Sequence, residues 1–257
     1  MLDISEKLSK LLQINMNYLI NPNLPSGKVK LCLIGASCID EIRELNSFGI
    51  ECITLKPCDF LPEEINYHAD MLAFHMGNGE IIASFDSIGE SNNILIRNTV
   101  HLGNKYPEDV LLNAALIGNK LICNTKTVSE HINSFAIDNN IEIIHINQGY
   151  SKCSICIVND NAIITDDPGI STLLKNYQID VLTINKGNIY LSDNHYGFIG
   201  GASGKIAEDI IYFSGNLEMH EDYTRIIDFL KYHNIHAVYN KKRILRDFGG
   251  FIPLTQY

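Results

Sequence analysis

The chain has 257 residues, 46% of them hydrophobic, and a formal net charge of −10, so it can bury a substantial core in one large domain or two small ones. The acidic balance disfavours nucleic acid as a partner, because neutralising phosphates requires a basic face and no Lys/Arg block exceeds Lys241-Lys242-Arg243. No stretch approaches the ~20 apolar residues of a membrane span, so we expect no membrane partner either.

The first 27 residues differ in pattern from the rest of the chain. Residues 3–19 have the apolar spacing of an amphipathic helix, and the segment 21–27, rich in Asn, Pro, Ser and Gly, interrupts it. We therefore predict an N-terminal helix and linker over 1–27 and a single domain over 28–257.

A strand–helix–strand pattern recurs after the linker. Four of its helices end in the same way, with polar or glycine residues, then Ile, a polar residue and a buried strand, which indicates an internal repeat. The predicted elements are strand 29–34, helix 39–48, strand 51–55, helix 108–117, strand 120–123, helix 128–138, strand 141–146, strands 154–158 and 162–165, helix 168–176, strand 180–184, strand 210–213, helix 220–233 and strand 236–239.

This repeat predicts an α/β fold, either as a doubly wound sheet or as a closed ring of ββαβ modules. The first module, over 29–55, lacks a complete preceding hairpin, and residues 249–254 look like an orphan strand near the end of the chain. A ring closes naturally if that last strand completes the first module, so we favour the ring.

His68 and Asp70 stand two residues apart at the start of an apolar run. If Ala69 opens a strand, the two side chains project to the same side, because strand side chains alternate. A general base and a carboxylate on one side of a strand end can form part of a catalytic site. The alternative is a histidine that caps a strand and an aspartate in a turn. Asn78, between two glycines, indicates a hairpin residue with positive φ that a ring could also bring to its centre.

Two further segments carry candidate binding residues. Residues 197–204 are rich in glycine but are not a P-loop, because the two outer glycines are six residues apart. This loop could cradle an anion with its backbone N–H groups, or cross a crowded centre where only glycine fits. His195 precedes the loop and Ser203 lies within it, while Asp167 is first a helix N-cap and alternatively a substrate ligand.

The cysteines favour a reduced, cytoplasmic setting. They are odd in number, most lie in apolar runs, and the N-terminus does not have the pattern of a secretory signal. Cys153 and Cys156 have CxxC spacing, but their segment reads as a strand that would turn the thiols to opposite faces, and no second pair follows. We therefore expect no metal and no cofactor. The seven are Cys32, Cys38, Cys52, Cys58, Cys123, Cys153 and Cys156.

Over residues 28–257 the sequence resembles the guanidino-group-modifying enzymes, or penteins, and most closely an uncharacterised bacterial family with that fold. The resemblance rests on residues 67–79, 148–154 and 197–204. It implies an α/β propeller, a ring of about five ββαβ modules around a pseudo-fivefold axis, closed by the C-terminal strand on the first module.

In the catalytic members of that family an H-x-D motif supplies an acid/base histidine and a guanidinium-binding aspartate, and His68-Ala69-Asp70 matches it. Their nucleophilic cysteine follows a glycine-rich turn near the end of the chain. Here Gly249-Gly250 occupies that place, and no cysteine follows Cys156. Cys153 also follows a glycine turn, two modules after His68, and is the candidate substitute.

The resemblance thus implies a C–N (amidine) hydrolase or an amidinotransferase that acts on a guanidine- or amidine-bearing small molecule. A catalytically inactive pentein-fold protein that binds a small molecule or a protein is the alternative. The missing C-terminal cysteine favours the inactive protein, whereas the retained H-x-D motif favours the enzyme. A nucleotide-binding protein that uses residues 197–204 is a weaker third reading, because a turn precedes that loop; a homodimer is left open. The expected catalytic residues are Cys153, His68 and Asp70, and the expected substrate-binding residues are Asn78, Asp167, His195, Gly200, Gly201 and Ser203.

Overall fold

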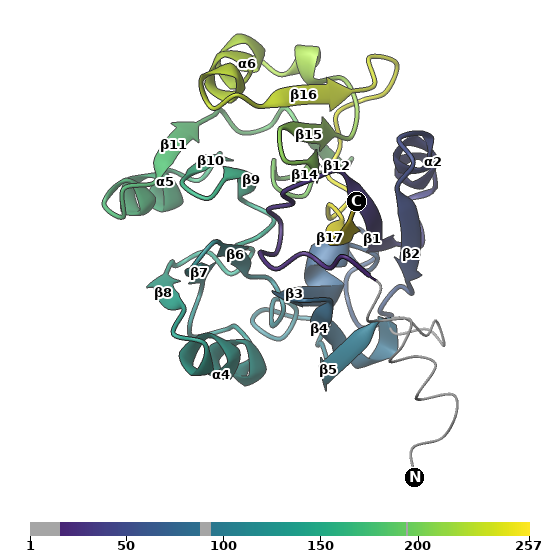
Figure 1. The fold of residues 1–257 in the computed structure, drawn as a ribbon, viewed down its shortest axis with the longest axis vertical. Helices are drawn as coiled ribbons and strands as arrows, with labels where there is room; N and C mark the ends of the chain where they lie inside the picture. Colours follow the sequence, from purple (N-terminus) through teal and green to yellow (C-terminus); the bar gives the residue numbers. More distant parts are fainter. Residues whose placement is uncertain (1–15, 88–93, 194) are drawn as a thin grey trace.

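Five three-stranded sheets make up most of the strand structure in this computed structural model, which describes residues 16–87, 94–193 and 195–257. In each sheet the middle strand is antiparallel to one neighbour and parallel to the other. In the view of Figure 1 the five sheets follow one another around the middle of the molecule. The sheets are β17 (Ile252–Gln256), β1 (Val29–Gly35) and β2 (Glu51–Leu55); β3 (Ala73–Gly77), β4 (Glu80–Ser84) and β5 (Leu95–Val100); β6 (Ala115–Ile117), β7 (Lys120–Cys123) and β8 (Glu142–His145); β9 (Cys156–Asn159), β10 (Ala162–Thr165) and β11 (Asp180–Thr183); and β14 (Ser203–Ala207), β15 (Ile210–Phe213) and β16 (His236–Tyr239).

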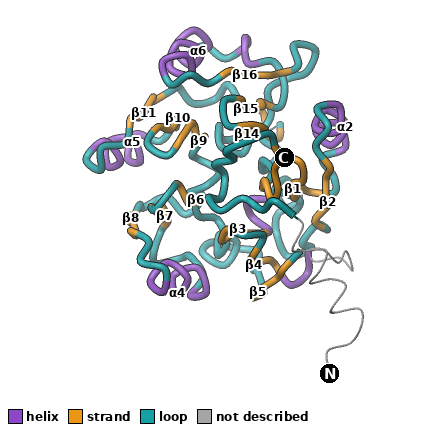
Figure 2. The backbone as a smooth tube through the Cα atoms, in the orientation of Figure 1, coloured by secondary structure: helices purple, strands orange, loops and turns teal. Residues whose placement is uncertain are grey.

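A helix joins the two parallel strands in four of these sheets, as parallel neighbours require a crossover connection. Figure 2 shows these helices at the periphery and the strands further in. In the sheet of β3, β4 and β5 the 3-10 turn η1 (Phe85–Ser87) follows β4, and residues 88–93 lie outside the described part of the chain. A short hairpin of β12 (Tyr190–Ser192) and β13 (His195–Tyr196) precedes β14. The four helices are α2 (Ile39–Ser47), α4 (Glu130–Asp138), α5 (Pro168–Lys175) and α6 (Tyr223–Tyr232).

The C-terminal strand pairs with the first strand of the chain, as the sequence predicts. β17 is antiparallel to β1, with Leu33 opposite Ile252, and it completes the first sheet. β1 and β17 are therefore held together in the core, where Val29, Leu33 and Leu254 are almost fully buried.

Three sequence predictions need correction. The helix predicted over 108–117 is absent, because this segment consists of turns followed by β6. Ala69 opens the short helix α3 (Ala69–Leu72) rather than a strand, so alternation does not set the directions of His68 and Asp70. Cys153 lies in a turn, and β9 begins only at Cys156.

The predicted N-terminal helix falls mainly on residues 1–15, which lie outside the described residues. Residues 16–27 contain no helix, and Tyr18 instead forms an antiparallel bridge with Thr255 of β17. Figure 1 shows the described N-terminal segment (dark purple) crossing the middle of the molecule before it enters β1. The amide of Leu19 donates to Leu254, and the carbonyl of Leu19 accepts from Asn78.

Short segments that we call the lead segments, one of which contains α3, precede the antiparallel outer strand of each sheet. They hold most of the glycine and polar residues that the sequence singles out. The five lead segments are residues 68–72 before β3, 110–114 before β6, 149–155 before β9, 197–202 before β14 and 246–251 before β17.

Hydrogen bonds join the five lead segments in a closed circuit. The amide of Asp70 donates to the carbonyl of Gly249, and the Asn113 side chain donates to the carbonyl of Asp70. The amide of Cys153 donates to Asn113 Oδ1, and the Cys153 carbonyl accepts from Gly201. Gly201 in turn accepts from two amides of the 246–251 segment. Residues far apart in the sequence thus meet at one centre.

Replacing Gly201 by alanine is expected to destabilise this centre. An added Cβ would lie 2.0 Å from Asp247 Oδ1, which is far inside van der Waals contact. Overpacking of this kind costs about 1–3 kcal/mol, measurable as the free energy of unfolding in urea. Gly169→Ala in the first turn of α5 is the matched control, because its Cβ would have 3.1 Å to the nearest atom. Equal stability of the two variants would contradict the prediction.

Candidate active site

His68 pairs with Asp247 in the centre of the molecule. His68 immediately precedes α3, is 1% exposed, and has its Nδ1 3.6 Å from Asp247 Oδ1. The Asp247 carboxylate is itself fixed, because it accepts hydrogen bonds from the amides of Gly249 and Phe198 at 2.9 Å each. Burial lowers the pKa of His68, and the Asp247 carboxylate only partly opposes this. His68 is therefore neutral near pH 7, and its Nε2 has no hydrogen-bond partner among the described residues.

Glycines allow this pair to approach the backbone closely. Gly249 has a φ of +77°, and an added Cβ would lie 2.2 Å from His68 Cβ. At Gly197 an added Cβ would lie 2.3 Å from Asp247 Cβ. Gly249 in the predicted C-terminal slot and Gly197 in the 197–202 lead segment thus make room for the histidine–carboxylate pair.

Asp70 brings a second carboxyl group to the same centre. It is 4% exposed, and both carboxyl oxygens lack a hydrogen-bond partner among the described residues. Burial raises the pKa of Asp70 to about 7; the Asp247 carboxylate adds to the increase and Lys152 opposes it. A buried polar group without a partner is costly, so Asp70 is poised for a hydrogen-bonding or cationic ligand.

This raised pKa predicts a pH dependence of stability. Folding raises the pKa of Asp70 from 3.8 to about 7, so between these pH values the folded state binds more protons than the unfolded state. The contribution of Asp70 to the free energy of unfolding is therefore complete at low pH and is lost as the pH rises. The free energy of unfolding should therefore fall, relative to that of Asp70→Asn, by about 1.4 kcal/mol per pH unit between about pH 5 and 7. Urea titrations at several pH values measure it. Exposed Asp59→Asn is the control, and parallel curves for wild type and D70N would contradict the prediction.

Cys153 lies in the lead segment 149–155, and Asn113 links this segment to the lead segment of His68. Its side chain is buried, with Sγ 3.0 Å from the donor Nδ2 of Asn113 and 4.0 Å from Met71 Sδ. Burial raises the pKa of the Cys153 thiol well above its usual value, and the carboxylates of Asp70 and Asp247 add to it. The thiol is thus protonated in this state. Sγ contacts Asn113 Nδ2 and Met71 Sδ, and the neighbouring Asp70 carboxyl group contributes to the raised thiol pKa; no hydrogen bond joins Sγ to His68 among the described residues.

Two small cavities adjoin the centre. One has about 20 Å³ and is lined by Asp70, His75, Lys152 and Asn23 among others, and the second has about 10 Å³ and is lined by Lys152 and Ser203 among others. Each has room for about one water. Asn23 of the N-terminal segment lines both, so that segment covers the centre on this side.

The structure brings some of the predicted binding residues to the centre. Gly201 donates to the Cys153 carbonyl, and an added Cβ at Gly200 would lie 2.3 Å from the Lys152 carbonyl oxygen. Ser203 is buried beside the smaller cavity and donates to the Ile199 carbonyl.

Three predicted binding residues lie elsewhere. Asn78 is exposed in the β3–β4 hairpin at a φ of +54°, the conformation that the sequence predicts. His195 is exposed on β13 and contacts Glu64, with 3.1 Å between Nδ1 and Oε1. Asp167 caps α5, where its Oδ1 accepts hydrogen bonds from the first helical amides.

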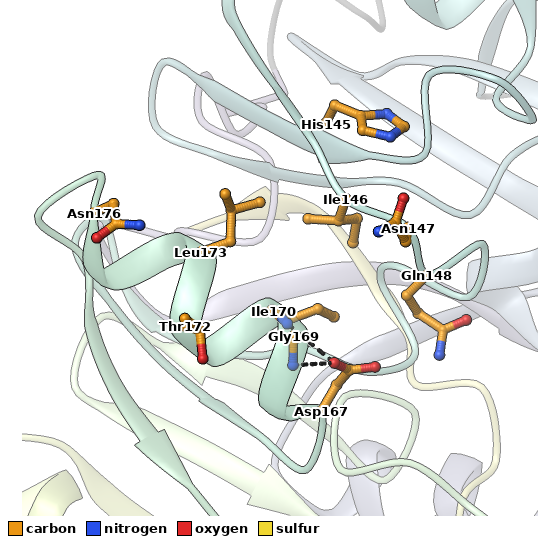
Figure 3. Close-up of a pocket in the computed structure, with 10 residues that line it drawn as sticks. All are labelled: His145, Ile146, Asn147, Gln148, Asp167, Gly169, Ile170, Thr172, Leu173 and Asn176. Carbon is orange, nitrogen blue, oxygen red and sulfur yellow. Dashed lines mark hydrogen bonds between the residues drawn. The ribbon is translucent and has the colours of Figure 1, made fainter.

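A groove of about 520 Å³ is lined by residues outside this centre. Figure 3 shows it between residues 145–148 and α5, with the Asp167 carboxylate turned toward the amides of Gly169 and Ile170. No residue of the His68–Asp247 pair, and neither Asp70 nor Cys153, lines this groove. We therefore place the candidate site at the centre.

Sequence reasoning missed two residues of this centre, Asp247 and Asn113. Neither belongs to a recognised motif, but both stand a few residues before the first strand of a sheet, as Cys153 does. That shared position was the available signal. Among the described residues no group of three or more His, Cys, Asp or Glu could hold a metal ion. No described helix has the length and apolar content needed to cross a membrane.

Comparison with known proteins identifies a family and a fold. A family model described as a family of unknown function, DUF6873, matches residues 35–252. The inosamine-phosphate amidinotransferase of Streptomyces griseus has a TM-score of 0.57 at 8% identity, covering 94% of this chain and 97% of that chain. An amidinotransferase of saxitoxin biosynthesis from Microseira wollei has a TM-score of 0.51 at 9% identity, covering 91% and 96%.

An agmatine deiminase from C. jejuni is similar to the same extent, with a TM-score of 0.52 at 9% identity, covering 85% of this chain and 89% of that chain. A search of the curated proteins found no match. At these identities the likeness concerns the fold, which is α/β and similar to that of the pentein enzymes. The resemblance inferred from the sequence is thereby confirmed.

Proposed function

The chain belongs to DUF6873, a family of unknown function, and we propose that this member is a hydrolase or transferase that acts on a guanidine- or amidine-bearing small molecule through a cysteine nucleophile. The observation that carries the proposal is the meeting of Cys153, Asp70 and the His68–Asp247 pair in lead segments that hydrogen bonds join at one buried centre. The reaction class is supported by the similar structures, which are two amidinotransferases and a deiminase.

We interpret the five sheets as a ring of five modules, an α/β propeller that β17 closes on β1. The identical strand order of the sheets and the closed hydrogen-bond circuit of the lead segments support this interpretation. In such a ring the lead segments all enter at the axis, which accounts for residues as distant as Asp70 and Gly201 lying in one circuit.

Substrate binding would use the two carboxyl groups. A planar guanidinium group presents several N–H donors, and Asp70 offers two unpartnered oxygens to them, with Asp247 nearby. The buried, weakly solvated setting strengthens such charge-assisted bonds. The same setting would disfavour an anionic group between Asp70 and Asp247.

The bound cation would also activate the nucleophile. Because the carboxylates of Asp70 and Asp247 help to raise the pKa of the Cys153 thiol, a cation bound against them offsets part of that increase. For the thiol and the imidazole to act on one carbon atom, the substrate would have to lie between Cys153 and His68, which do not contact each other through a hydrogen bond in the described residues. The thiol proton is then transferred to neutral His68, which acts as the general base.

The reaction proceeds in two steps. The Cys153 thiolate attacks the guanidinium carbon and forms a C–S bond; His68 gives its proton to the leaving amine, and the C–N bond breaks. The resulting amidino-cysteine adduct is attacked by water or by an acceptor amine, which His68 deprotonates, and the thiolate leaves. Attack by water makes the protein a hydrolase, and attack by an amine makes it an amidinotransferase.

Ligand binding without catalysis is the second candidate function. The closed centre favours it, because the cavity beside Asp70 has only about 20 Å³ and the thiol pKa is raised well above its usual value. As a setting for either function, we infer a small-molecule ligand, no nucleic-acid partner and a cytoplasmic location. The net charge of −10 and seven free cysteines support this setting.

A turnover screen tests the proposal. The protein is incubated with guanidino compounds, with and without an acceptor amine, and mass spectrometry follows the loss of substrate and the release of ammonia or amine. Consumption by wild-type protein is the expected result. Thermal stabilisation by a guanidino compound that is never consumed would overturn catalysis and favour the binding function.

A further inference from the structure

The side-chain hydrogen bonds of Asn113 all go to residues of two lead segments, 68–72 and 149–155. It is 1% exposed, and its Nδ2 donates to the Asp70 carbonyl at 3.0 Å, to Met71 Sδ at 3.2 Å and to Cys153 Sγ at 3.0 Å. Its Oδ1 accepts from the amides of Lys152 at 2.7 Å and Cys153 at 3.3 Å. One amide group thus holds both the backbone and the sulfur of Cys153.

We propose that Asn113 is a positioning residue, whose amide fixes Cys153 Sγ toward the centre and stabilises the thiolate by donating a hydrogen bond to it. This inference rests on the proposed function, because it gives Asn113 a part in forming the nucleophile. A buried thiolate needs a donor in place of water, since an unpaired buried charge is strongly disfavoured. An amide N–H donates at every pH, which a carboxyl or imidazole group in its place would not do.

The other groups that face the thiol do not supply this contact. Asp70 from α3 and Asp247 from the 246–251 segment both act against ionisation of Cys153, whereas the Asn113 hydrogen bond favours it. Tyr150 lies on the same lead segment as Cys153, but its hydroxyl donates to Asp109. Lys152 directs its Nζ to the Gly200 carbonyl at 3.4 Å. Asn113 is the one side-chain N–H donor to Sγ in the described part of the chain.

The test is the pH dependence of Cys153 alkylation by iodoacetamide, quantified by peptide mass mapping. Asn113→Asp keeps the shape, loses the donors and adds a carboxylate, while Asn113→Ala loses the donors without adding charge. Both should raise the pH of half-maximal alkylation, N113D by about one to two units. Asn124→Asp, a change to another buried amide that does not contact Cys153, should leave it unchanged.

A merely structural role for Asn113 would lower the unfolding temperature without moving this pH midpoint. An unchanged midpoint in the folded variants, with wild-type Cys153 alkylated, would overturn the inference and leave the proposed function intact. If N113D does not fold, the pH midpoint of Cys153 alkylation in N113A decides between the two outcomes. Wild-type Cys153 that stays unmodified while half-buried Cys52 reacts would overturn the proposed function, and this inference with it.

Discussion

Replacing Cys153 by alanine is expected to abolish turnover of guanidino compounds, with a loss of about 10⁴-fold or more in kcat. The reason is that no covalent adduct can form without the sulfur, and the remaining groups supply only binding and charge stabilisation. The free energy of unfolding should change little, because the replaced side chain is small and its sulfur accepts one side-chain N–H hydrogen bond, from Asn113. Steady-state kinetics and thermal unfolding measure the two quantities separately.

Cys156→Ala is the matched control for this experiment. Cys156 lies three residues further on, opens β9 and is 1% exposed, but it packs in a different apolar cluster from Cys153. Turnover by C156A should stay within a few-fold of wild type. Activity that survives C153A and is lost in C156A would refute the assignment of the nucleophile.

Replacing Asp247 by asparagine is expected to lower kcat by about 10²–10⁴-fold. The Asp247 carboxylate pairs with His68, and its two oxygens accept hydrogen bonds from the amides of Gly249 and Phe198. In the asparagine variant an Nδ2 donor would replace one of these oxygens and would point at a backbone N–H, which is also a donor. Loss of the carboxylate also removes the charge that opposes the lowering of the His68 pKa. The pKa of His68 should therefore fall further, which NMR titration of the imidazole measures.

Asp180→Asn is the control for D247N, because Asp180 also pairs with a histidine. Its Oδ2 lies 3.0 Å from His233 Nε2, with half of the Asp180 side chain exposed. Exposed pairs contribute little, so D180N should leave kcat and stability almost unchanged. Equal effects of D180N and D247N would show that the central pair has no special role.

The repeating pattern in the sequence predicted much of the fold. The predicted strands 120–123, 162–165, 210–213 and 236–239 have the bounds of β7, β10, β15 and β16. These strands are apolar and short, and turn residues bound them, so local pattern and tertiary burial agree. The prediction of a helix over 108–117 was wrong. Val110, Leu112 and Ala114 are apolar and pack into the core, but they do so from an irregular lead segment.

The candidate site was predictable only where a motif marked it. His68, Asp70 and Cys153 stand in motifs or beside glycine turns, and the structure brings their segments together. Asp247 and Asn113 have no local signature, because their roles arise from contacts across 179 and 40 residues of sequence, to His68 and Cys153. Asp167 does have a local signature, because an acidic residue directly before a helix is typical of an N-cap, and its carboxylate accepts a hydrogen bond from the amide of Gly169.

Alkylation by a haloacetamidine, an electrophile that imitates a guanidinium group, tests the central claim most directly. We expect peptide mapping to place the amidine adduct on Cys153, faster than alkylation by the matching neutral haloacetamide, because Asp70 and Asp247 attract the cation. Asp70→Asn should remove that preference. Labelling of half-buried Cys52 with Cys153 left unmodified would contradict the account.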